Sequence, residues 1–322
     1  MRILLWHVHG SWTTAFVQGR HSYVLPVLPD RGPDGLGRAR TWAWPASVLE
    51  CGPAELAEQP FDLVLLQRPE ELELVDRWLA RKPGRQLPAI YLEHNTPTES
   101  PCLQRHPLAD RADIPIVHVT RFNQLAWDNG IAPSTVIEHG IVDPGPRYTG
   151  ELAAGAVVVN EPGRRGRTVG ADLIPRLAEL APVDVFGMRT KEFVQSLSVD
   201  SVTAHEDLIT QDEMHTELGR RRVYLHPMRW TSLGLSLIEA MQLAMPVVAL
   251  AATDAVSAVP AGAGVVSTDL DRLRSAFRDY LSEPAAAREA GLVARAAALR
   301  RYGLPRFLAD WDRLIEHTVL DR

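Results

Sequence analysis

Runs of consecutive apolar residues recur along the first half of the chain and alternate with amphipathic stretches. Such runs, bounded by Gly, Pro and polar residues, predict buried strands. They occur at residues 2–8, 62–66, 89–94, 116–120 and 135–140. Between two of them, residues 70–81 place apolar side chains on one face and predict an amphipathic helix. Continuously apolar strands separated by helices are typical of a parallel sheet that helices cover on both faces.

The same pattern restarts in the second half of the chain. A stretch rich in Pro and Gly, residues 144–155, is typical of a linker and predicts a hinge near residues 143–154. After it, strands are predicted at residues 156–160, 183–187, 223–226, 247–250 and 265–266, and helices at 171–180, 271–281, 285–301 and 306–317. We therefore expect two doubly wound α/β domains, with a ligand between the carboxyl ends of their two sheets.

Composition narrows the class of protein. The chain has 322 residues, of which 46% are hydrophobic and 23% charged, as in an ordinary globular protein. Its net charge of −6 argues against nucleic acid as the main partner, because phosphate binding needs a basic surface. With only Cys51 and Cys102, a disulfide framework or a structural zinc site is not expected, and a reducing cytoplasm fits. Residues 1–8 are too short an apolar run for a secretory signal, and no run reaches membrane-spanning length. Peripheral membrane contact stays open.

A basic turn follows the strand predicted at residues 156–160. Residues 161–170 are predicted to be a loop, in which Arg164, Arg165 and Arg167 flank Gly166. Guanidinium groups match phosphate oxygens in pairs, and fixed cations stabilise a diphosphate leaving group. The sequence favours a diphosphate site here over the alternative, a solvated surface loop.

A polar turn that opens an apolar helix is the most informative motif of the chain. It runs from Thr231 through Ser232, Leu233, Gly234 and Leu235 to Glu239, the one carboxylate of that helix, and a strand of Val and Ala follows Pro246. A helix amino terminus attracts anions, and a carboxylate two turns further on accepts hydrogen bonds from sugar hydroxyls. The alternative is an ordinary buried helix with Glu239 at its rim.

Two further positions are candidates at strand ends. Gly10 follows the first strand, but the second and third glycines of a dinucleotide-binding fingerprint are absent. The glycine therefore indicates either a turn where a ligand phosphate can approach the backbone closely or a plain turn. His94, between Glu93 and Asn95, is a hydrogen-bonding or proton-accepting group or a structural histidine. Other histidines in similar positions, His7, His9, His139 and His226, compete with it.

Metal ligation is not expected. Histidines do not occur at helical ligand spacing beside a carboxylate. The triplet Asp269-Leu270-Asp271 is interpreted as a helix cap rather than as a metal site.

These motifs resemble the retaining glycosyltransferases of the GT-B fold, above all the large family four. The signature of that family is a glutamate, seven residues and a second glutamate, in a turn–helix–Pro-Val-Val pattern like the segment from Thr231 to Ala249. Glu239 matches the second glutamate, which in the family binds the nucleotide ribose. Thr231 occupies the position of the first glutamate, which in the family contacts the donor sugar. The basic turn is similar to the diphosphate site of the family, and His94 to a histidine near its acceptor.

The resemblance implies two Rossmann-like domains with parallel sheets facing a central cleft. It assigns residues 1–147 to the acceptor and 148–304 to the donor, with a last helix at 305–322 that packs back on the first domain. It implies transfer of a hexose-type sugar from a nucleotide-diphosphate donor, with retention and without metal or cofactor. Arg229 and the backbone N–H groups of residues 232–235 are further candidates for contacts with the donor.

Three alternatives stay open: a catalytically impaired sugar-nucleotide or glycan-binding protein, a sugar-nucleotide epimerase and, more distantly, a nicotinamide oxidoreductase. The base, sugar, acceptor and oligomeric state are left open.

Overall fold

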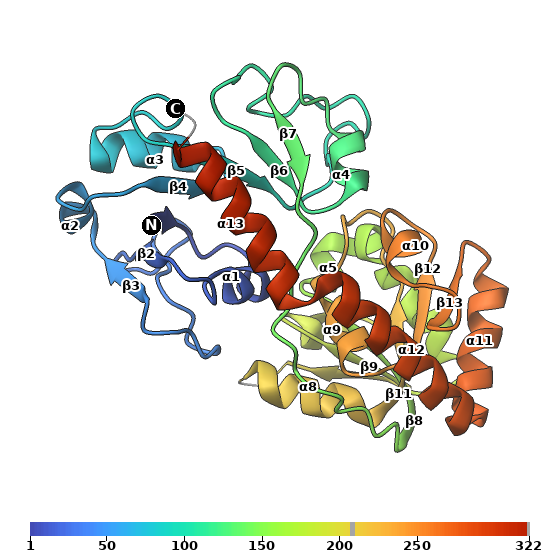
Figure 1. Ribbon diagram of the computed structural model, residues 1–322. Helices are drawn as coiled ribbons and strands as arrows, with labels where there is room; N and C mark the ends of the chain where they lie inside the picture. Colours follow the sequence, from blue (N-terminus) through green and yellow to red (C-terminus); the bar gives the residue numbers. More distant parts are fainter. Residues whose placement is uncertain (207–209, 321–322) are drawn as a thin grey trace. The chain divides into compact units, whose positions relative to one another are not determined.

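The computed structural model describes residues 1–206 and 210–320. It divides into two compact units, Met1–Val142 with Leu304–Arg322, and Asp143–Gly303 (Figure 1). The predicted class, two doubly wound α/β units, is confirmed, because each unit holds one parallel sheet with helices between the strands. The sequence placed the boundary at 147/148, a few residues beyond this division.

The described residues of the first unit form a seven-stranded sheet in the order β3-β2-β1-β4-β5-β6-β7. All of its strand pairs are parallel, with Leu4 beside Val64 in the register of β1 and β4. The strand order reverses between β1 and β4, and such a reversal opens a crevice at the carboxyl edge of a sheet. The strands are β1 (Arg2–Leu5), β2 (Ser22–Pro26), β3 (Val48–Cys51), β4 (Leu63–Leu66), β5 (Ala89–Glu93), β6 (Ile116–His118) and β7 (Ser134–Val136).

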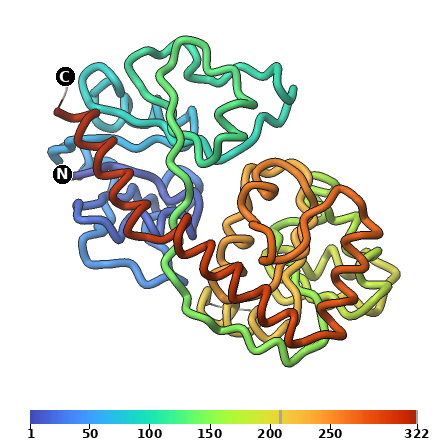
Figure 2. The backbone as a smooth tube through the Cα atoms, turned by 45° about the vertical axis from the view of Figure 1, so that its right-hand side comes forward, coloured from blue at the N-terminus to red at the C-terminus, as the bar shows by residue number. Residues whose placement is uncertain are grey.

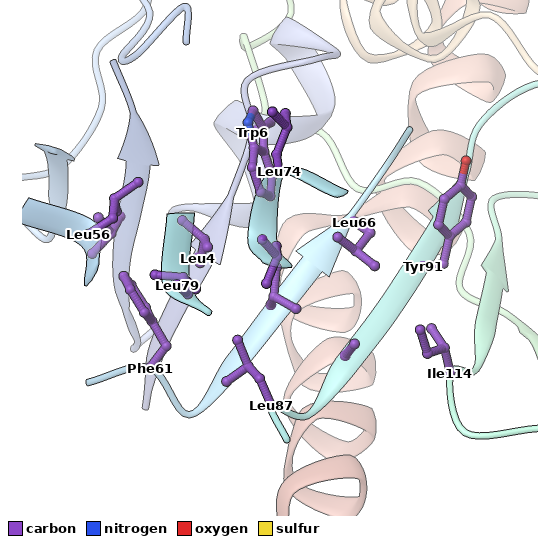
Figure 3. Close-up of a cluster of buried hydrophobic side chains, with 14 of the residues drawn as sticks. Leu4, Trp6, Leu56, Phe61, Leu66, Leu74, Leu79, Leu87, Tyr91 and Ile114 are labelled. Carbon is purple, nitrogen blue, oxygen red and sulfur yellow. The ribbon is translucent and has the colours of Figure 1, made fainter. Parts of the chain in front are cut away.

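Apolar side chains from these strands and from α3 (Glu70–Leu79) form the core on one face of the sheet. Leu4, Leu66 and Tyr91 of the strands pack in one cluster with Leu74 and Leu79 of α3 (Figure 3). The α3 helix ends at Ala80, which adopts a left-handed backbone conformation with φ +50°. The interior of the unit is therefore built as the sequence pattern predicts.

Five helices are described in the first unit: α1 (Gly10–Phe16), α2 (Pro53–Ala57), α3 (Glu70–Leu79), α4 (Arg121–Ala126) and α13 (Leu304–Leu320). The last of these comes from the end of the chain and lies beside the amino-terminal segments of the same unit (Figure 2). Trp311 of α13 packs edge-on against Trp12 of α1, with ring centroids 5.5 Å apart. Residues 321–322, which the expected last helix included, lie outside the described residues.

The second unit repeats the architecture. Its described residues form a six-stranded parallel sheet in the order β10-β9-β8-β11-β12-β13, which reverses between β8 and β11. The strands are β8 (Leu152–Val158), β9 (Val183–Phe186), β10 (Val202–His205), β11 (Arg221–His226), β12 (Val247–Leu250) and β13 (Gly264–Ser267).

Short helical turns follow β8, and longer helices close the unit. They are α5 (Pro162–Arg165), the 3-10 turns η1 (Gly166–Val169) and η2 (Ala171–Leu173), α6 (Ile174–Ala178), α7 (Thr190–Gln195), α8 (Gln211–Arg220), α9 (Leu235–Gln242), α10 (Ala255–Ala258), α11 (Leu270–Ser282) and α12 (Pro284–Tyr302). Among the described residues, no helix is both long and apolar enough to cross a bilayer.

Three sequence predictions are wrong in detail. Residues 152–155, expected in the linker, belong to β8. Residues 161–170, expected to be a loop, wind into α5 and η1, because Pro162 fixes the first helical backbone angle of α5. The helix expected at 171–180 is divided into η2 and α6. The cap expected at Asp269 is confirmed, since its side chain accepts hydrogen bonds from the backbone N–H groups of Asp271 and Arg272.

Candidate functional site

The basic turn lies at the carboxyl end of β8, where the sheet of the second unit reverses. Its arginines differ in their partners. Arg164 pairs with Glu161, and Arg167 pairs with Asp172 at 2.8 Å. Both side chains are largely exposed, so these ion pairs contribute little to stability.

Arg165 is the exception in this turn. Its side chain is half-buried, and within residues 1–206 and 210–320 its guanidinium makes no hydrogen bond or ion pair. Loss of solvent and the nearby Arg164 lower the pKa of Arg165. A guanidinium stays charged even so, and it carries five N–H donors. An anion bound beside Arg165 would supply the partner that this cation lacks.

The backbone joins the basic turn to the segment that follows β11. The carbonyl oxygen of Thr168 accepts hydrogen bonds from the backbone N–H groups of Arg229 and Trp230, at 2.9 and 3.1 Å. Close packing supports this junction at Gly170, where φ is +71° and a Cβ atom would lie 2.0 Å from the carbonyl oxygen of Pro227. The two sequence motifs are thus brought together at the reversal of the sheet.

Side chains reinforce the same junction. The guanidinium of Arg229 binds the carboxylate of Asp172, with 2.9 Å between Nη2 and Oδ2, and also donates to the carbonyl oxygen of Arg167. Arg167 and Arg229 therefore share one carboxylate, whose pKa they hold below its usual range. Positive charge remains in excess around Asp172.

The turn from Thr231 to Gly234 leads directly into α9. Ser232 and Leu233 are buried, whereas the Thr231 Oγ1 atom is enclosed without a hydrogen-bond partner among the described residues. Gly234 is the N-cap of α9 and provides no side-chain cap, and Leu235 is the first helical residue. A Cβ atom on Gly234 would lie 2.9 Å from Cε1 of the buried His226, so a larger residue here would require that imidazole to shift.

Glu239 lies inside the second unit rather than at an open rim. Its side chain is 3% exposed. Its Oε2 atom accepts a hydrogen bond from Nε2 of Gln211 at 3.0 Å and lies 3.5 Å from Nε2 of His215. Both partners belong to α8, a helix that the sequence analysis missed. The spacing of Thr210 and Glu213, a capping box, is the signal that would have found its start.

In the first unit, His94 follows β5 and is buried. Gln67 contacts it from the end of β4: the Gln67 amide nitrogen donates to the carbonyl oxygen of Trp6, and its Oε1 atom lies 3.2 Å from Nε2 of His94. An amide oxygen only accepts, so Nε2 of His94 carries the hydrogen. Glu93 and Asn95, on either side of His94 in the chain, bond to each other: the backbone N–H of Asn95 donates to the Glu93 carboxylate.

Three histidines gather at this edge of the sheet. The ring centroid of His94 lies 3.9 Å from that of His9 and 6.1 Å from that of His139. Burial lowers the pKa of His139 to about 3 and holds the pKa of His94 well below its usual value. The imidazoles of His94 and His139 are therefore uncharged at neutral pH. No group of three or more His, Cys, Asp or Glu side chains in the described ranges is arranged to hold a metal ion.

Gly10 begins α1, a helix of seven residues. The indole of Trp42 lies next to the position that a side chain would occupy here: a Cβ atom on Gly10 would lie 3.3 Å from Nε1 of that ring. The group that approaches this glycine closely is thus a side chain of the protein itself. The role of Gly10 toward a ligand stays a prediction.

Part of the second unit is similar to a known protein family. Residues 167–283 match the family model for the glycosyl transferases of group 1. This stretch is therefore similar to the group 1 glycosyl transferases. It contains Arg167, Arg229 and the whole segment from Thr231 to Glu239. None of the curated proteins matches the chain.

Solved structures of glycosyltransferases resemble this chain over its whole length. Sucrose-phosphate synthase from Thermosynechococcus elongatus has a TM-score of 0.71 at 14% identity and covers 100% of both chains. A glycosyltransferase from Rickettsia africae has a TM-score of 0.69 at 12% identity, covering 100% of this chain and 99% of its own. HepE of Anabaena in complex with UDP has a TM-score of 0.68 at 12% identity, covering 98% and 99%. At such identities the likeness establishes the fold, two Rossmann-like domains of the GT-B type.

Proposed function

We propose that this protein transfers a hexose-type sugar from a nucleotide-diphosphate donor to an acceptor, with retention of the anomeric configuration. The observation that carries the proposal is the junction at Thr168, where the basic turn meets the segment that opens α9. The guanidinium of Arg165 in this turn has no partner among the described residues. Support comes from the structures of Anabaena HepE with UDP and with UDP-glucose. The group 1 family match supports the reaction class.

In this proposal, Arg165 binds the diphosphate, with Arg164, Arg167 and Arg229 adding positive charge around it. Negative charge grows on the diphosphate as the sugar leaves, so cations that are already fixed there lower the barrier. Backbone N–H groups of residues 232–235, at the start of α9, bind the donor by the attraction of a helix amino terminus for anions.

The remaining candidates have narrower roles. Glu239 accepts hydrogen bonds from the ribose hydroxyls. His94, neutral and with its hydrogen on Nε2, contributes a hydrogen-bonding group near the reacting sugar rather than a charge. The proposal assigns the stabilisation of charge to arginines and requires no metal or cofactor.

A second candidate is a protein that binds a sugar nucleotide without turnover. Thr231 favours it, because this chain has a hydroxyl where the signature has a carboxylate, and the hydroxyl has no partner within the described residues. A sugar-nucleotide epimerase uses the same donor and is the third candidate.

Binding and turnover assays separate the three. Isothermal titration calorimetry with UDP, ADP, GDP and UDP-glucose measures donor binding. We expect at least one nucleotide to bind, and slow release of sugar from its sugar conjugate even without acceptor. Tight binding with no sugar released in any acceptor screen supports the binding protein. A converted sugar nucleotide, seen by chromatography without acceptor, supports the epimerase. Failure of every nucleotide to bind overturns the proposal.

A further inference from the structure

A buried carboxylate on an apolar helix needs hydrogen-bond partners, because loss of solvent is costly for a charged group. Glu239 is such a group, and the side chains of Gln211 and His215 meet its Oε2 atom from the neighbouring helix α8. Gln211 and His215 lie one helical turn apart, so they project from the same face of α8.

The amide of Gln211 sits between the other two groups. Its Nε2 atom lies 3.0 Å from Oε2 of Glu239 and 3.0 Å from Nε2 of His215. An amide nitrogen carries two hydrogens, so it donates one to the carboxylate and one to the imidazole. Nε2 of His215 then accepts, so the ring hydrogen lies on Nδ1. The three side chains form one hydrogen-bonded chain.

The start of α8 is itself held in place. The side chain of Thr210 accepts from the backbone N–H of Glu213, and the Glu213 carboxylate accepts from the backbone N–H of Thr210, at 3.2 and 3.0 Å. This capping box fixes where Gln211 enters the helix. The amide that contacts Glu239 therefore comes from a defined helical position.

We propose that Gln211 and His215 are positioning residues for the nucleoside half of the donor site, holding the Glu239 carboxylate in the orientation that binds a ribose diol. The inference rests on the proposed function. A glutamate side chain with free rotation loses conformational entropy when it binds, and a partner that fixes it beforehand reduces that loss. The fixed carboxylate should strengthen the binding of ribonucleoside diphosphates, which have both ribose hydroxyls. It should favour their 2′-deoxy analogues less, because these lack one of the two hydroxyls.

The test compares UDP with 2′-deoxy-UDP by calorimetry on the full chain, or ADP and GDP with their 2′-deoxy forms if the wild type binds those instead. The variants are Gln211→Leu, Gln211→Ala, His215→Leu, His215→Gln and Glu239→Gln. We expect Gln211→Leu to weaken UDP about tenfold, the scale of one hydrogen bond to a charged group, and to leave 2′-deoxy-UDP within about twofold. His215→Gln keeps an acceptor for the amide and should keep the preference for UDP better than His215→Leu.

Gln242→Leu is the matched control. It removes the same amide from a buried position on α9, three residues beyond Glu239, and its amide has no hydrogen-bond partner in the described part of the chain. It should leave the ratio of the two affinities unchanged. The double variant Gln211→Leu/Glu239→Gln should lose no more preference than Glu239→Gln alone, because both changes act on one contact.

The outcomes distinguish this inference from the proposed function. If Glu239→Gln removes the preference for UDP and Gln211→Leu and Gln211→Ala do not, positioning by α8 is wrong while ribose binding stands. Equal weakening of both ligands by the Gln211 variants also overturns it, since that result indicates a purely structural role. If Glu239→Gln leaves the preference intact, the ribose role of Glu239 itself fails. Thermal melting checks that each variant is folded.

Discussion

Arg165 is the arginine of the basic turn that has no anionic partner in the residues that the structure describes. Its neighbours are already neutralised in part by Glu161 and Asp172. Arg165→Gln should therefore weaken UDP binding by about 2 kcal/mol, as expected for a hydrogen bond to a charged group, and leave uridine binding unchanged. Calorimetry with both ligands measures the difference. The exposed Arg300 of α12 provides the control, Arg300→Gln. Equal losses for UDP and uridine would contradict a phosphate role.

Gln242 is a buried amide whose Oε1 and Nε2 atoms have no partners among the described residues. An unsatisfied buried polar group destabilises the folded state. Gln242→Leu, a change of similar volume, should raise the free energy of unfolding by about 1 kcal/mol. Urea unfolding followed by circular dichroism measures this free energy. A lower midpoint would show that the amide contributes to stability in solution.

Buried histidines make the first unit sensitive to acid. The pKa of His139 is about 3 in the folded protein and 6.5 when unfolded, because burial disfavours the charged ring. As the pH falls below 6.5, the unfolded chain binds a proton that the folded one excludes, so stability present above pH 6.5 is lost toward pH 3. The slope is about 1.4 kcal/mol per pH unit for one such group.

His139→Asn should flatten this dependence. Urea unfolding at pH 7.5, 6.5 and 5.5 gives the slope for wild type and variant. The comparison matters because Glu71, whose pKa burial raises to about 7, gains a proton in the folded state and acts in the opposite direction. The same slope in both proteins would show that His139 does not cause the loss.

At the scale of elements, α13 stabilises the first unit through one buried face. Phe307, Trp311 and Ile315 recur every four residues on that face, and Trp311 packs against Trp12 and Phe16. Trp311→Ala should cost about 3–5 kcal/mol, as for other buried tryptophans. Arg313→Ala on the exposed side of α13 should cost less than about 0.5 kcal/mol. Similar losses for the two variants, measured by thermal melting, would contradict the packing.

The elements also show what the sequence could predict. The central strands, such as β4 and β5, and the long helices α11 and α12 follow from apolar runs and helical periodicity. Short elements carry too few residues for a period to show. The edge strand β3 has only four residues, of which the first and last are buried and the middle two are exposed, and α8 is largely polar, so both were missed.

The candidate site, too, has parts that the sequence could predict and parts that it could not. The basic turn and the segment from Thr231 to Glu239 each carry a local pattern, and both lie after strands that meet where the sheet reverses. The partners of Glu239 and His94 could not be predicted. Gln211 and Gln67 are 28 and 27 residues away from them in the chain, and only the folded backbone brings them into contact.

At the scale of the whole molecule, the first unit is built from two separate parts of the chain, and the second unit from one. Removal of residues 304–322 should expose Trp12 and Phe16, because the aromatic rings of α13 pack on them. We expect amide hydrogen exchange to lose protection throughout α1 and β1 in this truncated chain, with β8 and β11 unchanged. Retained protection in α1 would show that the first unit folds without its last helix.

This interleaving sets an order for synthesis on the ribosome. The segment that completes the first unit is translated after all of residues 143–303. Until that segment emerges, aromatic side chains of the amino-terminal part stay exposed, although every residue of the second unit has already been translated. The portion made first is therefore finished last, and it is the portion that chaperones would have to shield.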